Sequence, residues 1–537
     1  MTDRRVTTLV ESHQGASALH RAEVTVPRRS VLEATARHHA DDVRGGLAAL
    51  SVGPMLLIAA GFVAVELIVA ARYGYHRDEL YFLACAKHLA WGYVDQPPLV
   101  PAVARISTAL FGSSAFALRA FPACAGGVAV VLTSLMAREL GGRRHAQIIA
   151  ALSAATSALV LATAHLLSTA AFDLMFWAAI TLLVLRLRRT GDARWWLAVG
   201  AVAGAGLLNK YNVAFLIASL VGGLVVTGGG RQLLNRWAGF GAAIALAMVL
   251  PNIIWNIGHH WAALSMLRSL HQENATLRSS LTFIPALLLF VGPVLAPIWI
   301  AGLRRLLADP VGRPFAVAFL VLVAIDTAAG AKPYYLGGLF CVLFAAGGVA
   351  AAERFAAWGR RGALFRKAAW MVAGSAVLLP LTLPVLPVAA LAKGSWEGEL
   401  NKDLSATVGW DRVAHQIGDI VAALPPAQRA GAVVFTEDYG AAGAVDRFGA
   451  RYGLRGAVSG HNNYWWWGPT AAADGATTVA VNFDRAYLET LFATVTPAGT
   501  VDTGHGVWTE ERGAPIYVCR GQKLPWRQLW PRARHYG

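Results

Sequence analysis

Long apolar segments, separated by short polar stretches, run through most of the chain. We distinguish eleven of them between residues 51 and 392, each 15 to 24 residues long. A helix needs roughly 20 apolar residues to cross the hydrocarbon layer of a bilayer. The segments cover residues 51–70, 117–137, 146–166, 170–187, 195–209, 211–229, 237–255, 281–303, 314–329, 334–352 and 369–392. The pattern predicts an α-helical polytopic membrane domain over residues 47–392, with about 11 transmembrane helices.

The two flanking regions differ from this pattern. Residues 1–46 combine seven basic with six acidic residues and contain no long apolar run, which predicts a disordered tail. Residues 393–537 carry fourteen basic and fourteen acidic residues, and short apolar runs alternate there with helical patterns. This alternation predicts a small α/β domain. We expect strands at 432–436, 457–459, 478–482 and 515–519, and helices at 443–452 and 485–495.

Composition and charge support a membrane protein. Of the 537 residues, 56% are hydrophobic and 15% are charged, whereas soluble proteins carry about 25% charged residues, so an ordinary soluble enzyme is excluded. The loops after the even-numbered apolar segments hold seventeen Lys and Arg residues, and the other loops hold nine. Because cytoplasmic loops retain basic residues, we expect a cytoplasmic N-terminus and an extracytoplasmic C-terminal domain. This distribution explains the net charge of +16 without a nucleic-acid partner.

Polar and aromatic residues gather directly after the first apolar segment, in YGYHRDELYF at 73–82. Ionisable groups close to lipid are costly and commonly functional. The adjacent Asp78 and Glu79 point in different directions on a helix, so one can face a cavity while Arg77 or Arg105 holds the other. The alternative is a solvated interfacial helix with a Tyr/Trp belt.

Other ionisable side chains lie at the same predicted membrane level. Asp173 begins an apolar segment, where a carboxylate is either a helix cap or a site residue. Lys210 and Lys332 lie at outer helix ends beside aromatic residues, as snorkelling lysines often do. Together, two lysines and two carboxylates could bind a phosphate and activate a hydroxyl. His76 beside Asp78 is a candidate for binding a divalent metal, although no full ligand set is present.

Several stretches carry a resemblance to a known family: GYHRDELYFLACAKHLAWGYVDQPPLVP, STAAFDLMFW, LNKYN, PNIIWN, AKPYY and SGHNNYWWWG. They resemble the bacterial glycosyltransferase family 39, whose members are related to the protein O-mannosyltransferases and to the aminoarabinose transferase of lipid A. The resemblance implies the C-type membrane glycosyltransferase fold and a polyprenyl-phosphate sugar as donor. The chain shows no Gly-rich nucleotide-binding motif.

The resemblance also implies roles for individual residues. Asp78 takes the position of the family's catalytic carboxylate and would act as general base, with Glu79 beside it and Asp173 as a second acidic residue. A single displacement would invert the anomeric centre. The acceptor would be a hydroxyl of a glycan, lipid or protein at the outer face of the membrane. The groups expected to neutralise the leaving phosphate are Lys210, Lys332, Tyr334, Tyr335 and Arg105.

The C-terminal region contains EDYG at 437–440 and SGHNNYWWW at 459–467, which resemble the outer domain of a subset of these proteins. Aromatic and amide side chains are typical of sugar-binding surfaces. A packed aromatic cluster against the membrane face explains the same residues equally well. The candidates for binding acceptor or sugar are His461, Asn462, Tyr464 and Trp465.

Two other functions stay open. A transporter or flippase of a lipid-linked sugar would carry functional charges at the bilayer midplane and broken helices in paired repeats, whereas the candidate charges here collect at one interface. A non-catalytic glycan-binding protein of wall assembly predicts loss of the acidic pair, which is present as Asp78 and Glu79. The sequence therefore favours the enzyme, and it leaves the sugar, the polyprenol, the acceptor and any metal requirement open.

Overall fold

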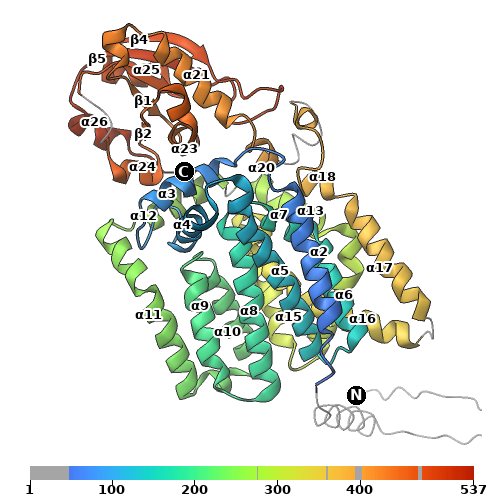
Figure 1. Cartoon of the computed structure of the whole chain (residues 1–537). Coiled ribbons are helices and arrows are strands. Elements are labelled where there is room, and N and C mark those ends of the chain that lie inside the picture. The colour runs from blue at the N-terminus through green and yellow to red at the C-terminus, as the bar shows by residue number, and fades with distance from the viewer. Residues whose placement is uncertain (1–46, 275, 358–360, 393–401, 470–473, 537) are drawn as a thin grey trace, which may run out of the picture. The chain divides into compact units, whose positions relative to one another are not determined.

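The structure is a computed structural model that describes residues 47–536 except 275, 358–360, 393–401 and 470–473. The predicted disordered tail, residues 1–46, lies outside the described residues. Residues 49–537 form one unit. It combines a helical membrane domain with a C-terminal domain that contains a β-sheet (Figure 1).

Five helices of the described residues are long and apolar enough to cross a bilayer, and seven spans result if each of two bent pairs counts as one. The five are α2 (Val52–Val69), α5 (Ala115–Glu139), α8 (Thr169–Thr190), α11 (Arg236–Gly258) and the segment Pro333–Arg354, in which η3 (Pro333–Leu336) leads into α16 (Gly337–Ala357). The bent pairs are α6 (Arg144–Thr156) with α7 (Ala158–His165), at 56°, and α13 (Leu277–Val291) with Pro293–Ala308, at 81°. The predicted count of eleven is therefore not confirmed.

Several apolar segments form helices that are short or broken. The predicted span 146–166 divides at Ser157, whose extended backbone (ψ 123°) ends α6 and begins α7. Its hydroxyl donates a hydrogen bond to the Val291 carbonyl oxygen at the end of α13 (3.0 Å). Further helices of the membrane domain are α4 (Leu99–Phe111), α9 (Trp195–Leu207), α10 (Val213–Val226), η1 (Gly230–Leu233), α12 (Ala262–Asn274), η2 (Pro293–Leu295), α14 (Ala296–Ala308), α15 (Arg313–Ala329), α17 (Arg361–Ala376), α18 (Leu379–Thr382) and η4 (Val388–Leu391).

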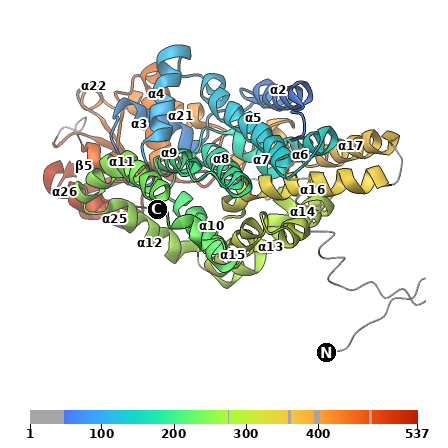
Figure 2. The same ribbon diagram turned by 90° about the horizontal axis from the view of Figure 1, so that it is seen from below.

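Helices α14 and α16 approach each other through glycines. A Cβ atom added to Gly302 would lie 2.0 Å from the Leu343 carbonyl oxygen, and one added to Gly347 would lie 2.1 Å from that of Ile298. Small residues allow membrane helices to pack at backbone distance, where dispersion contacts hold them together. The opposite side of α16 packs on α6, so that α16 lies between α6 and α14 in the view from below (Figure 2).

The first polar loop folds onto one end of the helical bundle. It forms α3 (Arg77–Lys87) and, after residues 88–98, α4. Helix α3 packs on α4 and on α23 (Tyr439–Phe448) of the C-terminal domain. The residues of the YGYHRDELYF stretch therefore lie where the membrane domain meets the C-terminal domain (Figure 1).

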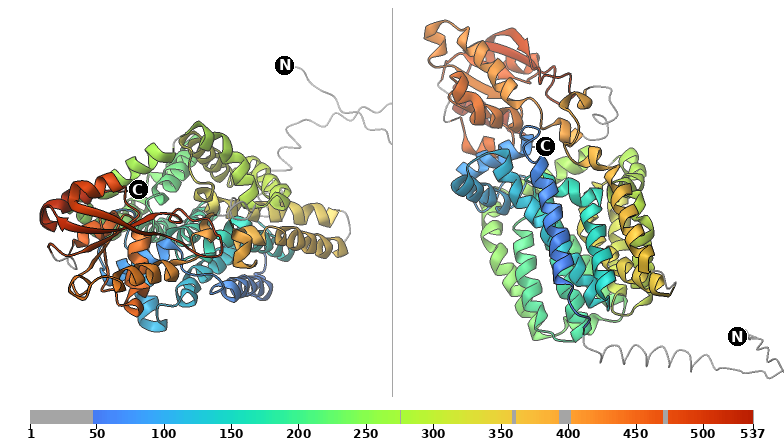
Figure 3. Two further views of the ribbon diagram at one scale, coloured as in Figure 1. Left: turned by 90° about the horizontal axis from the view of Figure 1, so that it is seen from above. Right: turned by 45° about the vertical axis from the view of Figure 1, so that its right-hand side comes forward.

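In the described part of the C-terminal domain, a five-stranded sheet has the order β2-β1-β3-β5-β4. β1 pairs in parallel with β2 and β3, and β5 pairs antiparallel with β3 and β4. The strands are β1 (Val433–Thr436), β2 (Ala457–Ser459), β3 (Thr478–Val481), β4 (Phe492–Thr500) and β5 (Pro515–Gln522) (Figure 3). The helices are α20 (Lys402–Ser405), α21 (Trp410–Ala422), α22 (Pro426–Arg429), α23, η5 (Gly449–Tyr452), α24 (Asn462–Trp467), α25 (Arg485–Leu491) and α26 (Trp526–Ala533).

The predicted small α/β domain agrees with this sheet in four strands and differs at two helices. Residues 492–495, expected to end a helix, begin β4. The stretch 494–496 contains three consecutive β-branched residues, which favour a strand, and β5 offers it a complete antiparallel partner. The other helix begins at Tyr439 instead of residue 443, because the Asp438 side chain caps α23 by accepting a hydrogen bond from the Ala441 amide (2.8 Å).

Candidate active site at the start of α3

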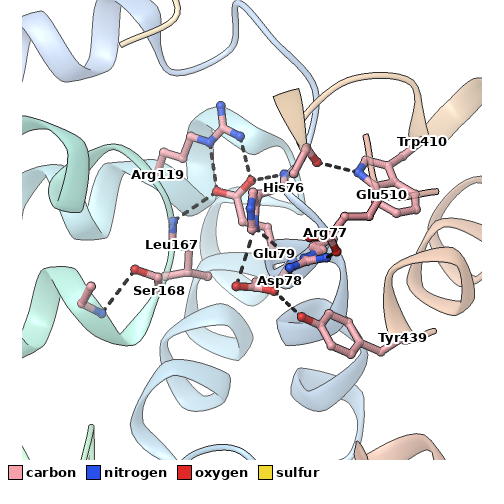
Figure 4. Close-up of polar contacts among 12 residues, drawn as sticks. His76, Arg77, Asp78, Glu79, Arg119, Leu167, Ser168, Trp410, Tyr439 and Glu510 are labelled. Atoms are coloured by element: carbon pink, nitrogen blue, oxygen red, sulfur yellow. Dashed lines mark hydrogen bonds and ion pairs between the residues drawn. The ribbon is translucent and has the colours of Figure 1, made fainter. Parts of the chain in front are cut away.

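The first turn of α3 is fixed by a capping box. The His76 Nδ1 atom accepts a hydrogen bond from the Asp78 amide (3.2 Å), and the Glu79 Oε2 atom accepts one from the His76 amide (2.9 Å) (Figure 4). Two of the amides that a helix start leaves unpaired are thereby satisfied. The capping box holds Asp78 and Glu79 at the positive end of the helix dipole.

Glu79 is fully buried and forms a two-pronged ion pair with Arg119 of α5. The Arg119 Nε atom lies 2.9 Å from Glu79 Oε1, and Nη2 lies 2.7 Å from Oε2. The Leu167 amide donates a third hydrogen bond to Glu79 Oε1 (3.1 Å). Arg119 also donates to the carbonyl oxygens of Ala70 (2.6 Å) and Gly74 (2.8 Å). Glu79 thus joins α3 to α5 and to the segment before α8, and its partner is Arg119 instead of the expected Arg77 or Arg105.

Asp78 points away from this ion pair, and its side chain is 37% exposed. The Tyr439 hydroxyl donates a hydrogen bond to Asp78 Oδ1 (2.8 Å). Desolvation alone would raise the pKa of Asp78, but electrostatic interactions with His76, Arg77 and Lys332 and the Tyr439 hydrogen bond together hold this pKa below its usual value. Asp78 is therefore an ionised carboxylate at neutral pH.

Two lysines extend the site from Asp78 towards Asp173. Lys332, just before η3, interacts electrostatically with Asp78 and with Lys210. Lys210, in the turn between α9 and α10, interacts in turn with Asp173, and its Nζ atom lies 4.3 Å from the centroid of the Tyr335 ring. The second tyrosine, Tyr334, is 5.0 Å from the same Nζ atom. The structure therefore brings the two predicted lysines and both tyrosines together with the carboxylates.

Asp173 is buried on the first turns of α8. Its Oδ2 atom accepts a hydrogen bond from the Asn212 side chain (2.9 Å), while Oδ1 has no hydrogen-bond partner within the described part of the chain. Asn209, close to the same turn, is fully buried and donates to the Thr169 carbonyl oxygen (2.9 Å). Asp173 is thus held by Asn212 and is the carboxylate that interacts with Lys210.

Arg105 and the aromatic C-terminal candidates lie differently. Arg105 is exposed on α4, and within the described ranges its guanidinium forms no hydrogen bond or ion pair with another predicted site residue. The Tyr464 hydroxyl donates to Asp446 (2.8 Å). The Trp465 indole donates to the Trp530 carbonyl oxygen (2.9 Å), and the Trp530 indole donates to the Trp465 carbonyl oxygen (2.8 Å). These contacts agree with the packed-cluster alternative for Tyr464 and Trp465.

His461 and Asn462 lie closer to the site. The His461 Nδ1 atom accepts a hydrogen bond from the Tyr439 amide (3.3 Å). Asn462 is buried with a left-handed backbone (φ 47°), and its Oδ1 atom has no hydrogen-bond partner among the residues described. Binding of acceptor or sugar by these two residues stays a prediction.

The residues around His76 do not fit a resident metal ion. No group of three or more His, Cys, Asp or Glu side chains in the described ranges is close enough to hold one. His76 Nδ1 already accepts the Asp78 amide as helix cap. The pair of His76 and Asp78 that the sequence suggested as metal ligands therefore lacks a third His, Cys, Asp or Glu ligand among the residues that the structure describes.

Three residues of the site were not singled out from the sequence. Arg119 is a lone charge in an apolar segment, which is a usable signal. Asp95 lies in the quoted VDQPP stretch and accepts a hydrogen bond from the Tyr81 hydroxyl (2.9 Å). Desolvation and the nearby Asp78 raise the pKa of Asp95 to about 7, against the effect of that hydrogen bond. Tyr439 lies 361 positions after Asp78, and nothing in the local sequence connects the two.

Comparison with known proteins gives related matches over different parts of the chain. Residues 95–255 match the family model described as dolichyl-phosphate-mannose-protein mannosyltransferase. Lipid A galacturonosyltransferase RgtD from Rhizobium johnstonii is 28% identical over 246 residues, which are 41% of this chain and 48% of that protein. The match thus spans about half the length of this curated relative.

Two solved structures of ArnT from Cupriavidus metallidurans are similar over most of their length. The apo structure has a TM-score of 0.57 at 15% identity and covers 88% of this chain and 98% of its own. The structure bound to undecaprenyl phosphate has a TM-score of 0.55 at 14% identity and covers 87% and 98%. These likenesses show the fold, and with the family-model match they confirm the resemblance to family 39 and the C-type membrane glycosyltransferases.

Proposed function

We propose that this chain, which has the fold of the C-type membrane glycosyltransferases, transfers a sugar from a polyprenyl phosphate to an acceptor hydroxyl at the outer face of the cytoplasmic membrane. The observation that carries the proposal is an ionised, partly exposed Asp78 that interacts with Lys332, which in turn interacts with Lys210. That arrangement supplies a base for a hydroxyl and positive charge for a phosphate within one site.

Asp78 is the proposed general base. An acceptor hydroxyl is a poor nucleophile until a carboxylate takes its proton as the new bond forms. The hydroxyl oxygen would bond to the anomeric carbon, the bond from that carbon to the phosphate oxygen would break, and the proton would pass to Asp78. One such displacement inverts the anomeric centre. Glu79 is engaged by Arg119 and two amides, so we assign it to positioning α3.

Lys332 and Lys210 are the proposed partners of the leaving phosphate. Charge-assisted donors stabilise a departing anion most when they are already in place. Tyr334 and Tyr335 pack beside Lys210 and can add hydroxyl donors. Asp173, which interacts with Lys210, would keep that lysine charged and oriented. We do not assign Arg105 to the phosphate, because it is exposed on α4.

The donor class and the sidedness rest on separate observations. A solved structure with this fold, ArnT, holds undecaprenyl phosphate, which supports a polyprenyl-phosphate donor here. The loops that flank the site hold fewer basic residues than the loops at the opposite ends of the apolar segments. Since cytoplasmic loops retain Lys and Arg, this asymmetry supports an outer-face site. The acceptor is a hydroxyl of a glycan, lipid or protein.

A donor panel tests the proposal. Purified protein in lipid vesicles is given radiolabelled polyprenyl-phosphate sugars one at a time, with membrane extract as acceptor, and the label transferred to acceptor is counted. The wild-type protein and Asp419→Asn, which changes an exposed carboxylate on α21, should transfer label from one donor. Asp78→Asn should not. Movement of the labelled lipid across the vesicle without transfer would instead support the flippase alternative.

A further inference from the structure

The C-terminal domain reaches directly into the candidate active site. Tyr439, the first residue of α23, donates from its hydroxyl to Asp78 Oδ1 at 2.8 Å (Figure 4). Within the described ranges this is the one hydrogen bond that a side chain donates to the Asp78 carboxylate, since His76 Nδ1 and Arg77 Nε lie at 3.7 and 4.0 Å. The carboxylate's most directional contact thus comes from the other domain.

The Tyr439 ring is held on several sides. Its amide donates to His461 Nδ1 (3.3 Å), and its ring centroid lies 4.8 Å from that of His461. The ring of Tyr81, on the next turn of α3 after Asp78, packs against it at 4.9 Å. Asp438 caps the helix that Tyr439 begins. The hydroxyl therefore has little freedom to leave Asp78 without movement of α23.

Further contacts hold the C-terminal domain on α3 and on the residues that flank it. Arg77 forms an ion pair with Glu510 of the C-terminal domain. The Asn463 side chain, on α24, accepts a hydrogen bond (2.7 Å) from the amide of Val94, which lies in the loop after α3. Arg447, on α23, donates to the Tyr75 hydroxyl (3.3 Å). These contacts lie around the Tyr439 hydroxyl and couple its position to the docking of the whole domain.

We propose that Tyr439 is a positioning residue for the transfer reaction, by which the C-terminal domain holds the base in its productive orientation. The inference rests on the function proposed above. A hydrogen bond to Oδ1 fixes the carboxylate plane and leaves Oδ2 to take the proton of the acceptor hydroxyl. It also favours the charged form of Asp78, because a donor stabilises a carboxylate more than a neutral acid.

The contribution of the Tyr439 hydroxyl to the pKa of Asp78 can be measured separately from those of the other groups around it. His76 and Arg77 face it from α3, Lys332 from the membrane domain and Tyr439 from the C-terminal domain. Asp95 and Tyr334 are also within electrostatic reach. Tyr439→Phe removes the one hydroxyl and leaves the ring and every other group in this environment unchanged.

The test compares Tyr439→Phe with Tyr464→Phe. The control also loses a hydrogen bond from a buried tyrosine to a carboxylate, here to Asp446, in the same domain but without contact to Asp78 in the described residues. Carbodiimide coupling modifies protonated carboxyl groups, so peptide mass spectrometry of Asp78 labelling against pH gives its titration midpoint without any turnover. Transfer rate against pH and against donor concentration is measured in parallel.

We expect the labelling midpoint of Asp78 to rise by about one pH unit in Tyr439→Phe and to match the wild type in Tyr464→Phe. The acidic limb of the transfer profile should rise with it, and kcat at neutral pH should fall by about tenfold through lost alignment, with the KM for donor unchanged. Transfer by the wild type, together with an unchanged midpoint and profile in Tyr439→Phe, would overturn this inference alone. No transfer by the wild type with any donor would refute the proposed function itself, and with it the positioning role.

Discussion

The buried ion pair beneath Asp78 gives the most demanding prediction. Arg119→Met removes four hydrogen bonds, two to Glu79 and one each to the carbonyl oxygens of Ala70 and Gly74. Both charged side chains are at most 1% exposed, so the variant leaves a buried carboxylate without its counter-charge. Breaking such a pair destabilises a protein by about 3–5 kcal/mol. The remaining amide donors to Glu79 cannot replace a full charge.

The same change should disturb the chemistry. Glu79 and Asp78 are adjacent on the first turn of α3. Without Arg119 the Glu79 carboxylate gains free energy by moving to solvent, and this movement displaces the turn that carries Asp78. A shift of about 1 Å at a reacting group lowers a rate by about 100-fold. We therefore expect Arg119→Met to lower the unfolding temperature and to reduce transfer by about two orders of magnitude, with donor affinity less affected.

The control lies at the other end of the same helix. Glu139, the last residue of α5, pairs with both Arg186 (2.7 Å) and Arg189 (2.5 Å). Arg186→Met leaves the second arginine in place, so its cost should be about 0–1 kcal/mol. Arg119→Met and Arg186→Met are compared by thermal unfolding in lipid nanodiscs and by transfer rate. Equal losses in Arg119→Met and Arg186→Met would refute the reasoning.

Three further predictions concern the phosphate, the helix packing and the pH response. Lys332→Met should weaken donor binding by about tenfold, as loss of one charge-assisted contact does, whereas Arg105→Met should not. Donor affinities are measured by titration, and equal affinities of the two variants would argue against Lys332 as the phosphate partner. Gly347→Ala should lower the unfolding temperature and destabilise the protein by about 1–3 kcal/mol, because its Cβ would lie 2.1 Å from a carbonyl oxygen. Gly222→Ala, with open space around the added Cβ, should not. Matching melting curves of the two variants would contradict the close packing of α14 on α16. Burial raises the pKa of Glu511 to about 7, above the value of about 4.3 for an unfolded glutamate. The native state therefore binds about one extra proton between these pH values, and stability falls as pH rises through them. Glu511→Gln should reduce the difference in unfolding temperature between pH 5 and pH 8, and an unchanged difference would count against the buried position of Glu511.

Local sequence signals predicted the parts of the site that lie on single segments. The apolar pattern and the polar stretch after it predicted Asp78 and Glu79 as site candidates. The outer helix ends predicted the two lysines, of which Lys332 interacts with Asp78 and Lys210 with Asp173. The sequence also predicted that the two carboxylates point in different directions. Glu79 is held by an arginine, and Asp78 is partly exposed. Periodicity and residue type carry this information because each signal lies within one or two helical turns.

Contacts between distant segments were beyond the reach of the sequence. Arg119 was not identified as the partner of Glu79, since the approach of α5 to α3 depends on how the bundle packs. Tyr439 comes from the other domain. Residues 492–495, expected to end the helix over 485–495, instead begin β4, because they pair with β5, a strand more than fifteen residues later in the chain. Tertiary packing decides the first two contacts, whereas for β4 the β-branched residues at 494–496 also carried a local signal for a strand.

The central claim is that Asp78 takes the proton of the acceptor hydroxyl, and a single-turnover comparison tests it most directly. Wild type and Asp78→Asn are loaded with the radiolabelled polyprenyl-phosphate sugar that the donor panel identifies and are mixed with acceptor. The dissociation constant of the donor is measured separately. We predict a rate lower by about 10²- to 10⁴-fold in Asp78→Asn at unchanged donor affinity. A single-turnover rate equal to that of the wild type would contradict the assignment of the base.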